Sequence, residues 1–405
     1  MIARILPILG VTFIDILGFS ILLPILPYFV KSFGSSDVVV GLLFSTFAAC
    51  QFFAGPVWGN LSDRIGRKMV LIVSQIGATI GWMMLAFAHT IAMVFIARMV
   101  EGASGGNLSV TQAYVADLVE PKQRGRAFAY VGAAFSAGIV FGPVLGGVLL
   151  ERYGFRAPFL AAAGLQLLTL AITIVMLPES RSGAGAEVAT VAHIRRSLQD
   201  PRVSPVLLQM WAISLALYAW FGVYALLLQA ALHFSASQTS FFFAAFGVLS
   251  VILQLGPVPR LIDAVGDRRS SNIGILCAFT GFAAVPLIHS LATLLPTFLL
   301  FAVGLSLARP GLSSMLTASV PENQRGTILG VSSALDNLSG FSMPPLSTGL
   351  LGRYGPPWAG AISTFFSLIA LLMGLSAQRK EQGALSSAEA HLTQEAGQTL
   401  AGSST

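Results

Sequence analysis

Twelve stretches of mostly apolar residues, separated by short polar segments, follow one another along this chain of 405 residues. A helix needs about 20 apolar residues to cross the hydrocarbon core of a lipid bilayer. The chain is 55% hydrophobic and 10% charged, whereas a soluble domain is about 45–50% apolar and about 25% charged. The sequence therefore predicts an all-α membrane protein with twelve transmembrane helices. The expected spans are residues 5–30, 38–58, 69–88, 91–114, 127–150, 156–177, 204–231, 238–258, 271–289, 291–314, 326–350 and 356–376.

The basic residues are unevenly distributed between the two sides that these spans define. If both termini are cytoplasmic, 17 of the 23 Lys and Arg residues lie in cytoplasmic segments and four lie on the opposite side. Because cytoplasmic loops carry the excess of positive charge in membrane proteins, we expect both termini in the cytoplasm. The bases are scattered through short loops and form no continuous basic face, which argues against nucleic acid as a partner. The expected partners are the lipid bilayer, a small-molecule substrate and protons.

The two halves of the chain are related in sequence. Leu61, Asp63 and Gly66 recur 200 residues later, and the tripeptides Gln123-Arg124-Gly125 and Arg152-Tyr153-Gly154 recur 201 residues later. Two repeats in the same orientation are typical of transporters whose site lies between the repeats, near the bilayer midplane.

This duplication predicts the domain organisation. We expect six-helix bundles at residues 1–177 and 204–376, joined by a cytoplasmic linker at 178–203 and followed by a disordered polar tail at 377–405. Within the linker, the stretch "VAHIRRSL" predicts a short amphipathic helix on the membrane surface.

The decapeptide "GNLSDRIGRK" between the second and third spans concentrates one acid and three bases in a short segment. One interpretation is a positive anchor on the cytoplasmic side. The other is a latch that stabilises the state closed to the cytoplasm: Arg67 would bind Asp117 at the end of the fourth span, and Gly66 would allow a positive φ. An exposed ion pair contributes only about 0–1 kcal/mol, so several such bonds would have to act together. The candidate gate residues are Gly59, Asp63, Arg64, Gly66, Arg67, Lys68 and Asp117, with Asp263 and Arg268 of the copy "RLIDAVGDRR". In that copy Asp267 replaces the first base, which predicts a weaker latch.

Five ionisable residues lie inside expected spans, namely Asp15, Arg98, Glu101, Arg309 and Asp336. Each costs about 2.5–3.5 kcal/mol at the bilayer centre, so such residues usually face a polar interior. Arg98 and Glu101 share one face of the fourth span and form either a self-neutralising pair or a proton-coupling site. Asp15 is an equal candidate for the proton or for contact with a cationic substrate. Arg309 either extends to the cytoplasmic interface or lines the cavity and attracts an anionic group; Asp336 either packs between helices or lines the cavity.

Further candidates lie on the fourth, fifth and seventh spans. Tyr218 can stack on a flat or cationic ligand, and Gln112 is a cavity candidate whose alternative role is helix–helix hydrogen bonding. The stretch "GIVFGPVLGG" places Gly138, Gly142 and Gly146 on one face, which predicts close helix contact. The same stretch also contains Pro143, which can bend the helix, and the small residue Gly147. A tight bend there would favour exchange over channel-like flow.

The chain resembles the major facilitator superfamily over essentially its whole length. The decapeptide resembles that family's signature loop, "IARMVEG" resembles its second motif, with Arg98 and Gly102 at the matching positions, and "GIVFGPVLGG" resembles its antiporter motif. The stretches "DILGFSILLPILP" and "AYVADLVEPKQRGRAF" are similar to twelve-span drug/proton antiporters, especially tetracycline exporters. Those exporters carry an acid on the third span where this chain has Gly81, which argues against tetracycline as the substrate.

The resemblance implies proton-coupled efflux of small amphipathic compounds by alternating access, carried out by a monomer in the bacterial cytoplasmic membrane. No nucleophile elbow, metal-ligand spacing or complete phosphate-binding loop occurs in the sequence, because "EGASGG" lacks the Lys-Ser/Thr ending. We therefore expect no enzyme activity and no cofactor, with the proton as coupling ion. The alternatives are a symporter or uniporter of a small metabolite, a lipid translocator and a non-transporting receptor, of which the last is disfavoured because long soluble domains are absent.

Overall fold

The computed structural model describes residues 2–105, 107–120, 123–179, 191–321, 324–379 and 382, which form helices joined by short turns with no strand among them. The helices of the first half are α1 (Ile2–Lys31), α2 (Asp37–Ile65), α3 (Arg67–Ala86), α4 (Ile91–Ser104), α5 (Asn107–Leu118), α6 (Arg124–Tyr153) and α7 (Arg156–Met176). The linker contributes α8 (Val191–Gln199). The second half contains α9 (Ser204–Leu232), α10 (Ala236–Leu255), α11 (Pro257–Val265), α12 (Asp267–Ala283), η2 (Val285–Leu287), α13 (Leu291–Ala318), α14 (Arg325–Tyr354), η4 (Pro356–Trp358) and a last helix over residues 361–379.

Within the described residues, nine helices are long and apolar enough to cross a bilayer, and each covers one of the predicted spans. The other three predicted spans are helical as well, but each has a feature that lowers its length or its hydropathy. The fourth is interrupted at Gly105, whose extended backbone ends α4 before α5 begins. The ninth is α12, only 17 residues long, and the eleventh is α14, which carries Asp336 and many Ser and Thr residues. The twelve-span count and the cytoplasmic termini stay predictions.

The charged decapeptide is mostly helix and not a loop, so this part of the sequence-based expectation is wrong. No helix breaker follows Gly59, so α2 continues to Ile65, and α3 begins at Arg67. Gly66 alone makes the turn, with φ of +103°. Gly266 separates α11 from α12 in the same way, with φ of +84°. Because L side chains rarely adopt these angles, the turn requires glycine in both copies.

The duplication seen in the sequence is also visible in the helix boundaries. α6 and α14 are each 30 residues long and begin at the paired positions Arg124 and Arg325. Both end in Arg-Tyr and are followed by a glycine of positive φ, Gly154 at +74° and Gly355 at +86°. The offset of 201 residues therefore relates equivalent helices of the two halves.

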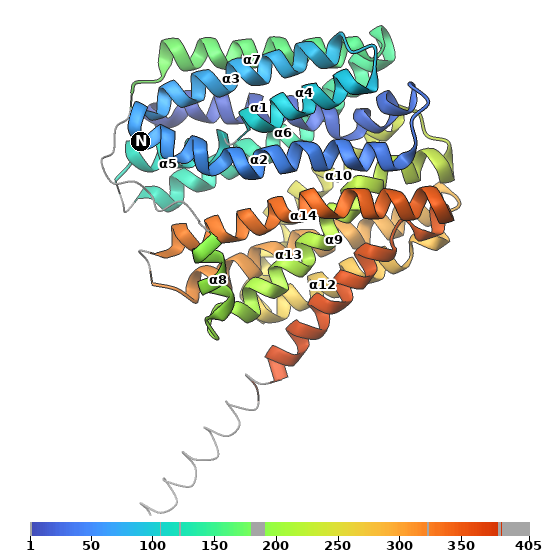
Figure 1. Cartoon of the computed structure of the whole chain (residues 1–405). Coiled ribbons are helices and arrows are strands. Elements are labelled where there is room, and N and C mark those ends of the chain that lie inside the picture. Colours follow the sequence, from blue (N-terminus) through green and yellow to red (C-terminus); the bar gives the residue numbers. More distant parts are fainter. Residues whose placement is uncertain are drawn as a thin grey trace, which may run out of the picture.

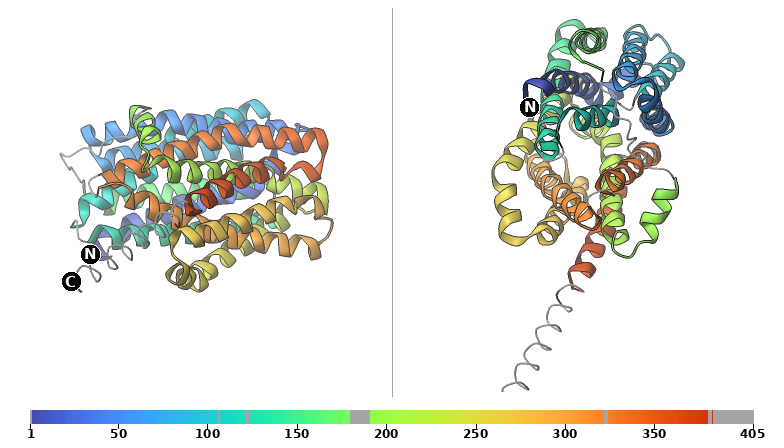
Figure 2. Two further views of the ribbon diagram at one scale, coloured as in Figure 1. Left: turned by 90° about the horizontal axis from the view of Figure 1, so that it is seen from below. Right: turned by 90° about the vertical axis from the view of Figure 1, so that its left-hand side faces the viewer.

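The helices gather in two groups, one from each half of the chain. The group from the first half lies above the other in Figure 1 and in the right-hand view of Figure 2. In the first group α1 packs against α6 and α7, and α3 packs against α4 and α7. In the second group α12 packs against α13, and α9 packs against α14. The most extensive contacts between the groups are those of α2 with α14 and of α6 with α10, and α1 also touches α9 and α10.

The closest contacts between the two groups lie toward one end of the molecule. The Tyr28 hydroxyl lies 2.6 Å from Thr239 Oγ1 and donates to the Phe234 carbonyl at 3.0 Å. Deeper in the molecule, the Ser45 hydroxyl donates to the carbonyl of Phe341. Tyr28 belongs to the last turns of α1, and Phe234 lies between α9 and α10. This is the end that the charge distribution predicts to be extracellular.

The linker and the C-terminal segment are partly as expected. The predicted linker helix is α8, which packs against α9 and α14 with Ile194 and Leu198 against the core of the second group. The last helix continues to residue 379, so residues 377–379 are not part of a disordered tail. Gln378 is held there because its side-chain oxygen accepts a hydrogen bond from Asn272 at 2.8 Å. Apart from Gln382, the rest of the predicted tail lies outside the described residues.

Candidate functional site

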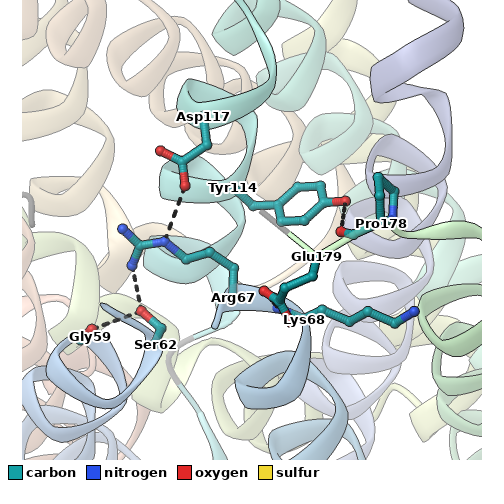
Figure 3. A network of polar contacts seen from close by, with 8 residues as sticks. All are labelled: Gly59, Ser62, Arg67, Lys68, Tyr114, Asp117, Pro178 and Glu179. Atoms are coloured by element: carbon teal, nitrogen blue, oxygen red, sulfur yellow. Dashed lines mark hydrogen bonds and ion pairs between the residues drawn. The ribbon is translucent and has the colours of Figure 1, made fainter. Parts of the chain in front are cut away.

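Several of the residues predicted to form a gate lie in a compact polar cluster around Arg67, shown in Figure 3. Arg67 Nε lies 3.4 Å from Asp117 Oδ2, which is the predicted ion pair. Arg67 also donates to the hydroxyl of Ser62, which in turn donates to the carbonyl of Gly59 at 2.7 Å. The Arg67 side chain is only 6% exposed. The guanidinium therefore ties the end of α2 to the start of α3 and to the end of α5.

A second set of hydrogen bonds attaches the end of α7 to the same corner. The backbone N–H of Lys68 donates to Glu179 Oε1 at 3.2 Å, and its ammonium group donates to the Ile174 carbonyl at 2.8 Å. The Tyr114 hydroxyl donates to the Pro178 carbonyl at 2.8 Å. All of these partners belong to the first half of the chain. In this conformation the cluster thus holds helices of one bundle together, and it is formed while the closest contacts between the bundles lie at the opposite end.

The remaining gate candidates take different positions. Arg64 is exposed at the end of α2, and Asp263 is exposed on α11. The side chain of Asp63 is not among those described. In the second copy Asp267 accepts a hydrogen bond from Ser314 at 2.6 Å, which joins α12 to α13. Arg268 follows Asp267 on α12 and is half-buried. In the second copy, a hydroxyl and a carboxylate therefore form one of the contacts between the helices.

Arg98 and Glu101 of α4 form the predicted intrahelical ion pair. Their side chains are 1% and 5% exposed, and the Arg98 guanidinium lies 4.2 Å from the centre of the Phe47 ring on α2. Glu101 Oε1 and two of the Arg98 nitrogens, Nε and Nη2, are buried without a hydrogen-bond partner among the described residues. Burying an incompletely satisfied charged pair inside a membrane protein costs free energy. Charged residues at such positions are therefore rare and usually have a function.

Glu101 reaches across the interface between α4 and α3. A Cβ atom added at Gly81 of α3 would collide with Cγ of Glu101 and lie 3.3 Å from the carbonyl of Ala97. The missing side chain at position 81 is therefore what leaves space for the carboxylate. Sequence reasoning noted the glycine and the acid separately and did not connect them.

Asp15 on α1 has a neutral partner. Its Oδ1 accepts a hydrogen bond from Gln166 on α7 at 3.1 Å, and Gln166 also donates to Thr169 at 3.2 Å. Gln166 is buried, and sequence reasoning missed it. The available signal was its amide group in the middle of an otherwise apolar span.

Three candidates from the second half lie together. Arg309 Nη2 on α13 lies 2.6 Å from Asp336 Oδ2 on α14. The Tyr218 ring on α9 packs against Gly340, one turn after Asp336 on α14. The sequence predicted each as a cavity residue but did not pair Arg309 with Asp336, because the two lie on different helices. Gln112 is on α5, and its side chain is not among those described.

The glycine-rich face of α6 makes the close helix contact that its spacing predicts. A Cβ atom added at Gly138 would lie within 3.0 Å of Ile16 of α1, and one added at Gly146 would lie within 3.0 Å of Ile21. A Cβ atom added at Gly142 would collide with Ser20 and Leu17. The Ser20 hydroxyl donates to the Gly138 carbonyl at 2.8 Å. Gly147 faces the other way, toward Ser240 of α10. Pro143 lies inside α6 without ending the helix.

Comparison with known proteins agrees with this architecture. Among relatives, the chain is 30% identical over 87% of its length to a tetracycline resistance protein of class C from Escherichia coli, of which it covers 91%. It is 26% identical to multidrug resistance protein 2 of Bacillus subtilis, with 82% of this chain and 85% of that protein covered.

Solved structures share the fold. The human organic anion transporter MFSD10 (TETRAN) superposes with a TM-score of 0.70 at 23% identity, covering 92% of this chain and 98% of that one. A bacterial homologue of the human lysosomal transporter Spinster superposes with a TM-score of 0.75 at 16% identity, covering 93% and 96%.

The family model described as Major Facilitator Superfamily matches this chain twice, over residues 8–229 and 223–401. The two matches together cover nearly the whole chain; the first runs from the first bundle into α9, and the second contains the remaining helices of the second bundle. This integral, multi-pass membrane protein belongs to the major facilitator superfamily of transporters.

Proposed function

We propose that this chain is a proton-coupled exporter of small amphipathic compounds in a bacterial cytoplasmic membrane. Relatives named as tetracycline and multidrug resistance proteins support export of drug-like compounds. The observation that carries the proposal is the buried Arg98–Glu101 pair. It supplies a carboxyl group that can take up and release a proton inside the membrane.

The chemistry of this pair is a balance between two opposing effects. Burial stabilises the protonated, neutral form of a carboxyl group, and a neighbouring guanidinium stabilises the carboxylate. A movement of α4 relative to α2 and α3 would change the contacts of Arg98 with Phe47 and of Glu101 with Gly81. Alternation between two such arrangements would bind the proton from one side and release it to the other. The membrane potential supplies about 2.3 kcal/mol per charge for each 100 mV.

Asp15 is the second acid in this proposal. Its hydrogen bond to Gln166 joins α1 to α7, so a cationic substrate group or a proton could replace the amide. The cluster of Arg67, Ser62 and Asp117 joins helices of the first bundle only and is formed while the predicted extracellular end is closed, so in this conformation it does not act as a latch between the bundles. Position 81 is a glycine where the tetracycline exporters that this chain resembles carry an acid, which supports a substrate other than tetracycline.

Reconstitution in proteoliposomes with an internal pH-sensitive dye tests the proposal. Addition of an amphipathic substrate to liposomes with an imposed pH gradient should trigger proton movement in the opposite direction. Glu101→Gln should abolish this movement, and Asp15→Asn should abolish or strongly reduce it. Glu151→Gln, an exposed acid on α6, is the matched control and should behave as the unaltered protein. Proton movement that persists at full rate in both Glu101→Gln and Asp15→Asn would refute the coupling role.

A further inference from the structure

The ion pair between Arg309 and Asp336 lies in the membrane-spanning part of the second bundle and is partly exposed. The two side chains are 34% and 19% exposed, unlike Arg98 and Glu101, which are at most 5% exposed. One of the two Nη groups of Arg309 donates to Asp336 at 2.6 Å. Because a guanidinium carries five N–H groups in a planar fork, this bond uses only part of the donor capacity of a side chain that is one-third exposed.

The neighbours of this pair place it at the junction of the two bundles. Gly340 lies one helical turn beyond Asp336, on the same face of α14. A Cβ atom on Gly340 would stand 3.2 Å from Ala48 of α2 and 3.2 Å from the Tyr218 ring of α9. Helices from both halves therefore meet within one turn of Asp336. The positions of α14 that touch α2 include Gly340, Phe341 and Pro344, which follow Asp336 in the chain.

The surroundings combine a displaceable charge with an aromatic surface. Tyr218 contributes its ring from α9, next to the Arg309–Asp336 pair. A guanidinium binds a carboxylate-like group through two parallel hydrogen bonds, and it is more weakly hydrated than an ammonium group. An incoming anion can take over the bond that Asp336 now accepts, whereas a neutral compound cannot replace a carboxylate in this role.

We propose that Arg309 binds an anionic oxygen group of the substrate, with Asp336 as the counter-ion that the substrate displaces and Tyr218 stacking on its ring. The substrate class is aromatic compounds that carry a carboxylate, phenolate or enolate. This inference rests on the proposed export function because it assigns a substrate class to the same transport site. It assigns recognition to the second bundle and leaves proton binding to the first.

Binding to the purified full-length protein tests the proposal without any need for proton coupling. The probes are three compounds that share a naphthalene ring and carry an anionic, a neutral or a cationic substituent: 1-naphthoate, 1-naphthylmethanol and 1-naphthylmethylammonium. The unaltered protein should bind 1-naphthoate best in isothermal titration calorimetry. Arg309→Gln should weaken binding of 1-naphthoate by about tenfold or more, as expected for loss of a charge-assisted hydrogen bond, and should change binding of 1-naphthylmethanol by less than about twofold.

Asp336→Asn provides the discriminating second variant. It removes the competing carboxylate, so binding of 1-naphthoate should be retained or strengthened. The proposal would be overturned if Asp336→Asn bound 1-naphthoate more weakly than the unaltered protein while Arg309→Gln bound it equally well. It would also be overturned if the unaltered protein preferred 1-naphthylmethylammonium. Arg353→Gln, at the exposed end of α14, is the matched control and should leave all three affinities unchanged.

Three measurements separate failure of this inference from other failures. Binding of 1-naphthylmethanol reports whether Arg309→Gln is folded, and Arg309→Lys, which keeps the charge but not the fork, should fall between the unaltered protein and Arg309→Gln. Glu101→Gln should still bind 1-naphthoate even when it no longer couples to protons. If Glu101→Gln does not alter proton coupling, the proposed coupling role is refuted. The anion site is then still tested separately, by the binding data for 1-naphthoate.

Discussion

At the scale of single residues, Gly81 and Glu101 form a complementary pair across α3 and α4. The glycine has no structural need for a special backbone angle, because it lies in the middle of α3. Its role follows from what a side chain would displace, which is the Cγ atom of Glu101. A residue without charge thereby determines where a charged group lies.

Gly81→Ala should therefore disturb the coupling pair. Overpacking at such a contact costs about 1–3 kcal/mol, and displacement of Glu101 should slow substrate-driven proton movement by about tenfold or more, which corresponds to about 1.4 kcal/mol. Combination with Glu101→Asp, which is one methylene shorter, should restore part of the rate. Gly164→Ala on α7 is the control, because nothing lies within 4 Å of its added Cβ atom. Equal rates in Gly81→Ala and Gly164→Ala would contradict this account.

The Arg67–Asp117 pair is the second feature at this scale. We expect a double-mutant cycle with Arg67→Gln and Asp117→Asn to give a coupling free energy of about 0.5–3 kcal/mol, the range for residues in one network. Thermal or denaturant unfolding in detergent provides the measurement. Arg64→Gln, two residues before Gly66 and exposed, should change the free energy of unfolding by less than about 0.5 kcal/mol. Strict additivity of the two changes would show that the pair contributes nothing.

At the scale of whole helices, the contact between α1 and α6 depends on small residues. Gly138, Gly142 and Gly146 recur every four residues and present one face to α1. In a bilayer, where apolar surface is already solvated by lipid, such close backbone approach is a main source of helix association. The bundle therefore relies on the absence of side chains along this face.

Two substitutions on the same helix test this dependence. Gly142→Ala should destabilise the protein by about 1–3 kcal/mol, because its Cβ atom would lie 2.5 Å from the Leu17 carbonyl. Gly132→Ala, where nothing lies within 4 Å of the added atom, should be neutral or stabilise the helix by up to about 1 kcal/mol. The melting temperatures of the two purified variants give the comparison. The packing argument fails if both variants melt at the same temperature.

At the scale of the molecule, the two bundles are held together mainly toward one end. Tyr28 is the most connected residue there, because its hydroxyl bonds to Thr239 and to the Phe234 carbonyl of the other bundle. These bonds are formed while the Arg67 cluster at the opposite end stays inside the first bundle. The described conformation is therefore the one in which the predicted extracellular side is closed.

Tyr28→Phe should shift the conformational equilibrium toward opening of that end. Loss of one to two hydrogen bonds costs about 0.5–1.5 kcal/mol each, which changes the population ratio by about tenfold when the total is 1.4 kcal/mol. The measurement is labelling by a membrane-impermeant maleimide of Phe243→Cys, a buried position on α10, in a protein with Cys50 and Cys277 replaced by Ser. Tyr114→Phe removes one hydrogen bond at the other end and is the control. A labelling rate unaffected by Tyr28→Phe would assign closure to the α2–α14 contact instead.

The sequence by itself determined the features that depend on neighbouring residues. Apolar length predicted the membrane spans, charge distribution predicted their orientation, and the offset of about 200 residues predicted two related bundles. Gly66 was identified as a turn, because the requirement for positive φ is local to one residue. The Arg67–Asp117 and Arg98–Glu101 pairs were also predicted, the first from its motif and the second from helical spacing.

Only the tertiary structure decided which side chains meet across helices. Asp15 binds Gln166 across 151 positions, Arg309 binds Asp336, Tyr28 joins two bundles, and Glu101 lies against Gly81. None of these contacts follows from hydropathy or periodicity, which determine the face that a helix turns inward but not its neighbour or its depth. Those are determined by packing, since small residues such as Gly81 and Gly340 allow one helix to approach another only at particular positions. The sequence thus identified the transporter fold and its charged residues, and packing arranged those charges into sites.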